Sequence, residues 1–448
     1  MKRFKYIIVG SGPGGSTVLK TLIDLGISDV AVIEEGNKSK NTVMGTYEEL
    51  IEKYRYGGAD IIFSKPNIAY AEGKTVGGGS EVNSGLYHRI PEDVLSQWNS
   101  ERGINIDQNE LLEHYEFIEN WLKVETSDEI PSLISKKLIE STEKSDLNYE
   151  EIPRWKPLKS IFYDLKEELN LIENTKVVKI IKSGEDFKLI CLNKLTKNIT
   201  ELVCSKLIIA AGTFETPKLL KFSGYKLKNN SFSIHPHIKV GAKFDKSLYD
   251  GEKVSPYQVK YSKYNSSFGT SINSRQWKAL FLSENINTFK KEIPDIDNIG
   301  IFYNAIRPYG KGSIKYLKSL NTNILTYKFL EKDIENLIYG TRKLIQLLQG
   351  IGATKIILPT SLDIDQSDIL KFTKKQFKSL SIHTVHTFSS MAMGDHNSNT
   401  DSNGIFNDDG DILISDSSIL PGPPGVNPQG PLMALCRRNA IKFIEKTS

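Results

Sequence analysis

The sequence predicts an α/β protein with two domains, one a nucleotide-binding domain on a parallel sheet and the other an antiparallel sheet with helices (α+β). Three observations support this prediction. The chain opens with a β-α-β pattern whose first turn is rich in glycine, and patches of alternating polarity follow between about residues 232 and 317. The chain has 448 residues, of which 39% are hydrophobic, and this is enough for more than one core.

The opening unit is read from three short segments. Residues 6–9 form a short apolar run with β-branched members, as in a strand buried on both faces. Residues 16–25 carry a helical pattern, and residues 30–33 form a second apolar run. Together they predict a β-α-β unit.

The first turn of this unit carries a dinucleotide-binding pattern, G-x-G-x-x-G. Gly10 permits the tight turn, Gly12 lets the backbone approach a pyrophosphate, and Gly15 lets the helix pack closely on the strand. The helix N-terminus then directs N–H groups at the phosphates. Glu34 ends the second strand, where an acid binds a ribose hydroxyl. This pattern alone does not separate NAD from FAD. The full turn reads Gly10-Ser11-Gly12-Pro13-Gly14-Gly15.

Further elements are expected downstream. Residues 159–169 have a helical pattern, and residues 176–181 form a strand. Residues 187–191 and 201–203 suggest a hairpin, and residues 207–210 form another buried strand that runs into Ala211 and Gly212.

Two helices are expected in the second half of the chain. Residues 333–349 form an amphipathic helix that Asp333 can cap and Gly350 can end. A final helix is expected from Pro431, which suits a first helical position, to Glu445. Before them, the alternation of Tyr257, Val259 and Tyr261 predicts an antiparallel sheet with one exposed face. The helical stripe at residues 333–349 comprises Ile334, Leu337, Ile338, Thr341, Ile345 and Leu348.

Charge and cysteine content exclude several classes. The 58 basic and 54 acidic side chains give a net charge of +4, without a basic block beside aromatic residues, so no nucleic-acid partner is expected. Cys191, Cys204 and Cys436 do not make a disulfide framework and fit a reducing compartment. The N-terminal apolar run is too short for a signal peptide, and no run reaches the length of a membrane span. We therefore expect a cytoplasmic protein without a transmembrane segment.

Several further segments resemble, in order, the signatures of the glucose–methanol–choline (GMC) oxidoreductase family. The resemblance spans the whole chain, and the ordered set is more specific than any single motif. The matching segments are residues 73–89 (GKTVGGGSEVNSGLYHR), 212–224 (GTFETPKLLKFSG), 307–314 (RPYGKGSI), 386–394 (HTFSSMAMG), 415–418 (SDSS) and 425–429 (GVNPQ).

The resemblance implies bound FAD. The backbone of residues 77–80 would approach the flavin and the diphosphate, and Asn83 would contact the isoalloxazine ring. Val177 matches a residue that contacts adenine, and Asp416 matches an aspartate near the ribityl chain. Residues 79–82 contain no histidine and His88 lies further on, so we expect non-covalent FAD. The complete expected cofactor site is Gly10, Gly12, Pro13, Gly14, Gly15, Glu34, Gly77, Gly78, Gly79, Ser80, Asn83, Val177, Ala211, Gly212, Asp416, Pro428 and Gln429.

The resemblance also implies a catalytic pair. His386 lies at the family's catalytic histidine position, and Asn427 at a second position that is His or Asn. We expect His386 to take the hydroxyl proton, because the pKa of a histidine suits that task, and Asn427 to orient the substrate oxygen. His383 is a rival, one helical turn away. No Cys or carboxylate cluster completes a metal site with it, so no metal is expected. His235 and His237 are expected to be structural or to lie near the pocket rim.

These features predict an FAD-dependent oxidoreductase that moves a hydride from a substrate C–OH group to flavin N5. The substrate is expected to be a small alcohol, sugar or polyol, and the electron acceptor, oxygen or another, stays open. The alternatives are a NAD-dependent dehydrogenase and a redox-silent lyase or binding flavoprotein. We expect a Rossmann-like FAD-binding domain from residues 1–95, 159–232 and 386–448, and a substrate domain from residues 96–158 and 233–385.

Overall fold

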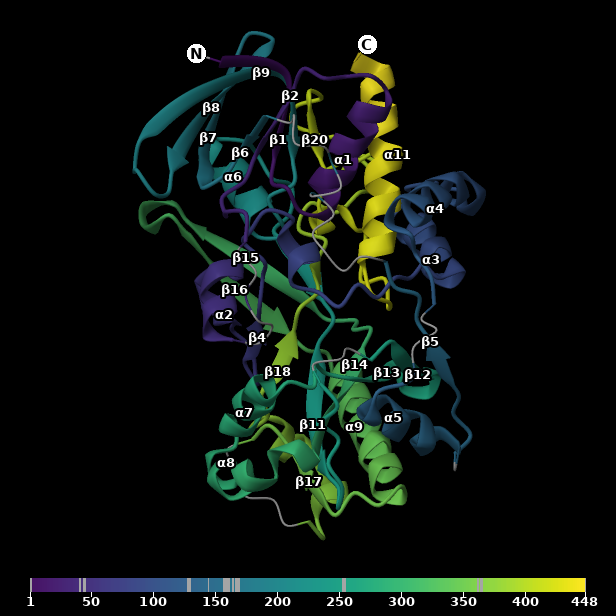
Figure 1. Cartoon of the computed structure of the whole chain (residues 1–448). Coiled ribbons are helices and arrows are strands. Elements are labelled where there is room, and N and C mark those ends of the chain that lie inside the picture. Colours follow the sequence, from purple (N-terminus) through teal and green to yellow (C-terminus); the bar gives the residue numbers. More distant parts are fainter. Residues whose placement is uncertain are drawn as a thin grey trace.

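The computed structural model shows two layered halves (Figure 1). In the upper half, a mixed sheet carries helices α1 (Pro13–Asp24) and α11 (Gln429–Thr447). In the lower half, an antiparallel sheet carries helix α9 (Glu331–Gly350), and both chain ends lie at the upper end. This arrangement confirms the predicted fold class. The structure describes residues 2–39, 42, 46–126, 130–143, 145–155, 162, 165, 170–251, 255–360, 362 and 366–447.

The upper sheet combines a parallel part with an antiparallel part. Strands β6, β2, β1, β9 and β20 run parallel, while β9, β8 and β7 form an antiparallel meander. Strands β2 and β20 are short apolar runs, and their burial on both faces is why they lack alternation. In spatial order the strands are β6 (Asn170–Ile172), β2 (Val30–Ile33), β1 (Lys2–Val9), β9 (Ile199–Ile209), β8 (Asp186–Asn193) and β7 (Thr175–Ser183), with β20 (Ile412–Ile414) also paired to β9.

Strand β9 corrects one prediction. Residues 201–203 and 207–210 were expected to be separate strands, but β9 runs without a break from Ile199 to Ile209 and contains all of them except Ala210. Its first half pairs with β8, and its second half lies between β1 and β20. Lys206 interrupts the apolar pattern, and its ammonium is 2.5 Å from the Asp411 carboxylate. This pairing lets the strand continue past a charged residue.

The lower sheet has one apolar face and one polar face. Strands pair antiparallel except β4 and β18, which are parallel. Ile238 and Val240 of β11, and Phe302 of β14, are buried in the core that α9 and α5 (Leu133–Glu143) cover. The strands are β3 (Asp60–Ile62), β4 (Ile68–Tyr70), β18 (Ile382–Thr384), β11 (His237–Lys243), β14 (Ile299–Ile306), β13 (Ser266–Thr270), β12 (Tyr257–Tyr261) and β5 (Tyr149–Glu151), with β17 (Lys355–Ile357) also on β11.

Helix α9 matches its prediction closely, apart from its cap. The predicted stripe is buried or partly buried against the sheet. The N-cap is Leu330, however, and Asp333 lies in the first turn. The Asp333 carboxylate accepts hydrogen bonds from the backbone N–H groups of Leu330 (3.0 Å), Tyr309 (2.7 Å) and Gly310 (2.9 Å). A buried first-turn carboxylate thus satisfies the helix start and fixes the adjoining loop.

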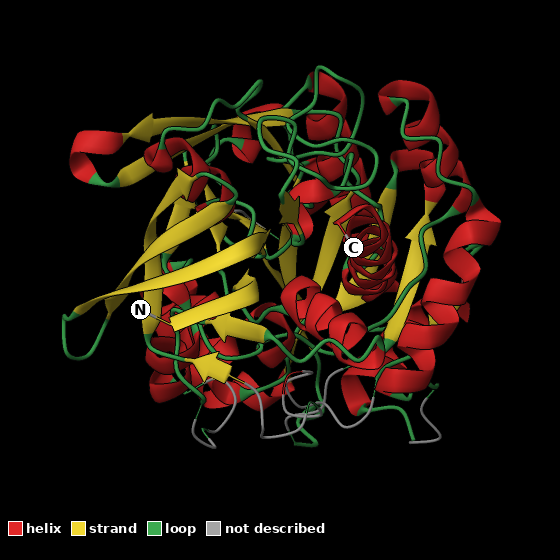
Figure 2. Cartoon of the chain, turned by 90° about the horizontal axis from the view of Figure 1, so that it is seen from above, coloured by secondary structure: helices red, strands yellow, loops and turns green. Residues whose placement is uncertain are grey.

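A smaller sheet and several helices complete the fold. The final helix begins at Gln429, two residues before the predicted Pro431, and α11 packs on α1 and α4. Figure 2 shows α11 end-on beside the strands of the upper sheet. The small sheet has the order β16 (Thr322–Lys328), β15 (Lys311–Leu317), β10 (Ser231–Ile234) and β19 (Thr387–Phe388). The other helices are α2 (Tyr47–Lys53), α3 (Glu92–Arg102), α4 (Gln108–Leu122), α6 (Glu215–Ser223), α7 (Arg275–Ser283), α8 (Ile286–Glu292) and α10 (Lys374–Phe377).

The predicted helix at residues 159–169 lies outside the described residues, apart from two isolated positions. The division into five segments stays a prediction, although β3 and β4, which fall within residues 1–95, join the lower sheet. Among the residues that the structure describes, no helix combines the length and apolar character that a membrane crossing needs.

Candidate active site

A single large cavity joins the two halves of the molecule. Its volume is about 1110 Å³, and residues of both sheets line it. Gly12 and Val177 line it on the upper side, and Lys239 and Tyr303 line it on the lower side. A cavity at a domain interface is the usual place for a cofactor and a substrate to meet.

Glycines form one end of this cavity. Gly10 has φ +102°, and a Cβ on it would lie 2.2 Å from the Ala210 carbonyl oxygen. A Cβ on Gly78 would lie 2.8 Å from the Gly12 Cα, so two glycine loops meet backbone to backbone. Gly12 is also the N-cap of α1, and no side chain caps that helix. Bare peptide groups at a helix N-terminus suit a diphosphate.

Three predicted site residues lie behind this wall and are not among its lining residues. A Cβ on Gly15 would lie 2.1 Å from the Gly10 carbonyl oxygen, so the close packing of α1 requires glycine there. The Gly77 N–H donates to the Ser11 hydroxyl (3.0 Å), and the Ser80 hydroxyl donates to the Gly77 carbonyl (2.7 Å). These residues hold the wall in place.

Glu34 lies in the wall, and its carboxylate already accepts three hydrogen bonds. Its Oε2 accepts from the Ser11 N–H (3.0 Å) and hydroxyl (2.8 Å), and its Oε1 accepts from the Gly36 N–H (2.8 Å). Burial raises the pKa of Glu34, and these bonds oppose the shift. A carboxylate has about four acceptor positions, so one remains for a ribose hydroxyl.

Asp416 joins two segments of the wall. Its Oδ2 accepts from the Gly212 N–H (3.0 Å) and the Thr216 hydroxyl (2.5 Å), and its Oδ1 accepts from the Ser418 N–H (2.9 Å). Gly212 and Asp416 both line the cavity, as does Ala211. Burial raises the pKa of Asp416, and the hydrogen bonds oppose the shift.

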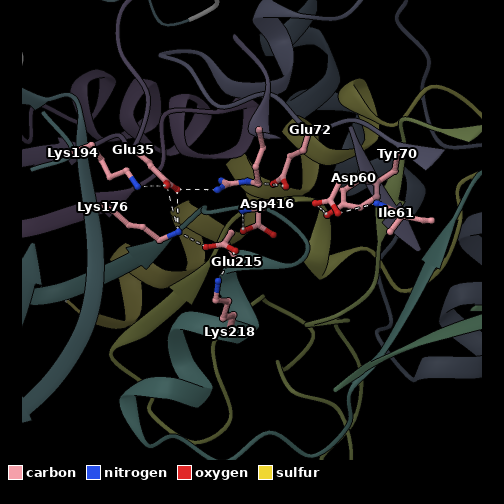
Figure 3. A network of polar contacts seen from close by, with 12 residues as sticks. Glu35, Asp60, Ile61, Tyr70, Glu72, Lys176, Lys194, Glu215, Lys218 and Asp416 are labelled. Atoms are coloured by element: carbon pink, nitrogen blue, oxygen red, sulfur yellow. Dashed lines mark hydrogen bonds and ion pairs between the residues drawn. The ribbon is translucent and has the colours of Figure 1, made fainter. Parts of the chain in front are cut away.

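An ion-pair cluster that the sequence did not predict lies along the same wall (Figure 3). Arg55 contacts Glu35 (3.0 Å) and Glu72 (3.2 Å), and Lys176 contacts Glu215 (2.6 Å) and Glu35 (3.3 Å). Burial raises the pKa of Glu72 to about 7, although Arg55 opposes the shift. The five residues come from separate parts of the chain, so no local pattern marks the cluster. Lys176 directly precedes Val177, which also lines the cavity.

The start of α11 is tied to the first glycine-rich signature. The Asn83 amide donates to the Gln429 side-chain oxygen (2.6 Å), and the Asn83 oxygen accepts from the Gly85 N–H (2.9 Å). Asn83, Pro428 and Gln429 line the cavity. The positive end of α11 therefore lies at this wall, where it favours negative charge.

His386 lies in the wall, paired with His235. Their Nδ1 atoms are 3.3 Å apart, and His235 Nε2 accepts from the Gly425 N–H (3.1 Å). Because Nε2 of a neutral His235 is the acceptor, its proton lies on Nδ1 and is donated to His386 Nδ1. In this neutral pair, His386 carries its own proton on Nε2. Burial lowers the pKa of His386 to about 4.

Asn427 reaches the same region of the cavity. Its side-chain N–H donates to His88 Nδ1 (3.3 Å). Burial, with smaller contributions from the charges of Lys260 and His386, lowers the pKa of His88 to about 4. Asn427 also follows Gly425, which contacts His235, by two residues. The structure thus brings the two predicted catalytic residues to one region of the wall.

The other histidines correct two expectations. His235 and His237 were expected to be structural or at the rim, but both line the cavity and His235 contacts His386. His383 lies on strand β18, not on a helix, and its Nε2 is 2.9 Å from the Glu284 carboxylate. Within the described part of the chain, no group of three or more metal-ligating side chains could hold a metal ion.

One sequence signal could have revealed these residues. His235, His237 and Lys239 follow each other at every second position, and all three line the cavity. Polar residues at a period of two mark one face of an extended segment. Lys239 continues the pattern of the two histidines, so all three side chains lie on the same face.

Comparison with known protein families gives two matches. Two family models described as GMC oxidoreductase match residues 4–159 and 308–436. An uncharacterized GMC-type oxidoreductase of Sinorhizobium fredii is 27% identical over 487 residues, covering 99% of this chain and 95% of the relative. A long-chain-alcohol oxidase of Arabidopsis thaliana is 23% identical, covering 94% of this chain and 66% of the relative.

Solved structures share the fold at low sequence identity. A pyridoxine 4-oxidase, whose source is given as Mesorbium loti, has a TM-score of 0.74 at 14% identity, covering 99% of both chains. A fungal aryl-alcohol oxidase has a TM-score of 0.73 at 12% identity, covering 100% of both chains. At such identities the likeness shows the fold alone.

Proposed function

Because the chain belongs to the GMC oxidoreductase family, whose members depend on FAD, we propose that it oxidises the alcohol group of a small molecule. The observation that carries the proposal is the wall of one cavity, which holds both the glycine turns and His386 with Asn427. The alcohol oxidases among its distant relatives support the reaction class.

The cavity wall fits FAD. The turns at Gly12 and Gly78 would hold the diphosphate, Glu34 a ribose hydroxyl, and Asp416 the ribityl chain, while Asn83 would lie beside the ring. When bound, FAD supplies the acceptor for a hydride.

We propose that FAD is held non-covalently, since His88 accepts a hydrogen bond from Asn427 and is not among the lining residues. Acid precipitation of the protein should therefore release the yellow cofactor into the supernatant.

The chain supplies the proton acceptor. We infer that His386 takes the hydroxyl proton at Nε2, the ring nitrogen that does not contact His235. That nitrogen has a lone pair only when His386 is protonated on Nδ1, whereas the Gly425 N–H favours the other tautomer through His235. Proton uptake therefore requires the Gly425 N–H to leave His235. The loop that carries Gly425 also carries Asn427. A substrate that hydrogen-bonds to Asn427 is therefore placed to move the Gly425 N–H away from His235.

The test is anaerobic mixing of the purified yellow protein with a panel of alcohols, followed by admission of air. Bleaching of the flavin band by an alcohol is the expected result. Recovery of the colour in air would assign an oxidase, and recovery only with an added quinone or dye would assign a dehydrogenase. If the flavin stays oxidised with every alcohol, the chain is a redox-silent flavoprotein and the proposal is wrong.

The pH dependence of flavin reduction follows from the lowered pKa of His386. Below its pKa the ring is protonated and cannot accept a proton, so the rate should fall about tenfold per pH unit below about pH 4. Above about pH 5 the ring is neutral and the rate should be level. Stopped-flow reduction at low substrate concentration, with thermal melting as a check on folding, measures this profile. An apparent pKa near or above that of an ordinary histidine would contradict the assignment.

A further inference from the structure

The lower wall of the cavity is the polar face of the antiparallel sheet. On β11, His237 and Lys239 line the cavity, while Ile238 and Val240 between and beyond them are buried in the core. The alternation follows directly from strand geometry. This wall faces the region of His386, because His235, which precedes β11, contacts His386.

Neighbouring strands extend the same polar wall. Tyr303 of β14 is the register partner of Lys239 and lines the cavity. The Gln258 amide of β12 donates to the Tyr303 hydroxyl (3.1 Å). Ser262, Ser267 and Ser271 also line this part, beside the apolar residues Ile272, Trp277 and Leu280.

Lys239 is the conspicuous charge in this wall. Within the described residues its ammonium makes no hydrogen bond or ion pair, although it lines the cavity. Burial lowers its pKa, and the charge of Glu284 opposes the shift. Glu284 is already committed to His383, whose Nε2 is 2.9 Å from its carboxylate. Lys239 is partly buried, and a partly buried ammonium that lines a cavity without a contact partner is placed to bind a ligand anion.

We propose that Lys239 binds a carboxylate of the substrate, so that the molecule oxidised is a hydroxylated carboxylic acid. That the substrate also carries a hydroxyl group, and that this group is oxidised, rests on the proposed function. Lys239 lies four positions after His235 in an extended segment, a Cα distance of about 13 Å, and the lysine side chain spans part of it. Several carbon atoms therefore separate the carboxylate from the reacting hydroxyl, as in a sugar acid. Lys239 would repel amino alcohols, whose ammonium carries the same charge.

The test compares acids with their neutral amides, which have nearly the same shape. Gluconate and gluconamide, and glycerate and glyceramide, are titrated calorimetrically into the His386→Ala holoenzyme, so that binding is measured without turnover. The better acid is expected to bind about 10- to 100-fold more tightly than its amide, as for a hydrogen bond between charged groups. Lys239→Met should abolish this ratio, and Lys239→Arg should keep most of it.

Lys260→Met is the matched control. Lys260 also lines the cavity, but its ammonium is 2.9 Å from the Glu150 carboxylate and its side chain is 58% exposed. The acid-to-amide ratio should not change in this variant. The proposal is overturned if no acid binds better than its amide, or if Lys239→Met leaves the ratio intact. If acids are preferred but no alcohol bleaches the flavin of the native protein, the carboxylate site stands and the proposed oxidation fails.

Discussion

Replacement of His386 by alanine is expected to leave FAD bound and to slow flavin reduction by about two to four orders of magnitude. The side chain lies in the cavity wall, and its neutral ring is the proton acceptor that we propose for the hydroxyl group. The cofactor contacts come from other segments, so the yellow colour and its spectrum should persist. Anaerobic stopped-flow absorbance at the flavin band measures the rate directly.

Two further variants make this result specific to His386. His383→Ala removes the rival histidine, which is bonded to Glu284, and should slow the reaction much less. His396→Ala removes an exposed histidine and should have no effect. Flavin reduction at the native rate in His386→Ala would refute the assignment. A larger loss in His383→Ala than in His386→Ala would transfer the role to His383.

The sequence predicted those parts of the fold in which the pattern is local. The opening β-α-β unit and helix α9 were found because their apolar residues repeat at the period of the element that they form. Strand β9 was divided in two because Lys206 breaks its apolar run, and only Asp411, which is distant in the sequence, shows how that charge is accommodated. Asp333 was placed at the wrong cap position because its partners, Tyr309 and Gly310, belong to a preceding loop.

The same limit applies to the site. The glycine turns and the segments around His386 and Asn427 carry their own motifs, so they could be read from the chain alone. The contact between His235 and His386 joins residues 151 positions apart, and no sequence motif predicts it. This contact matters for the chemistry, because with the Gly425 N–H it determines which nitrogen of His386 holds the proton. A motif can name a catalytic histidine, but its tautomer depends on neighbours that only the fold supplies.

Replacement of Gly14 by alanine is expected to abolish FAD binding and to lower the free energy of unfolding by about 3 kcal/mol or more. The new Cβ would lie 1.9 Å from the Ser415 carbonyl oxygen, far inside contact distance. Ser415 cannot move away easily, because its N–H is bonded to the Ile209 carbonyl (2.8 Å) and its neighbour Asp416 holds Gly212. The start of α1 must therefore shift and leave the glycine wall.

The cofactor content of the purified variant, read from its flavin absorbance, and its thermal melting temperature test this expectation together. Gly410→Ala is the matched control, since nothing lies within 4 Å of a Cβ at that position. That variant should hold FAD as the native protein does and change stability by no more than about 0.5 kcal/mol. If Gly14→Ala retains full flavin content and native stability, the close approach of α1 to the Ser415 backbone is not required, and the diphosphate does not depend on it. Loss of flavin with a native melting temperature would instead place the effect in the diphosphate contact itself.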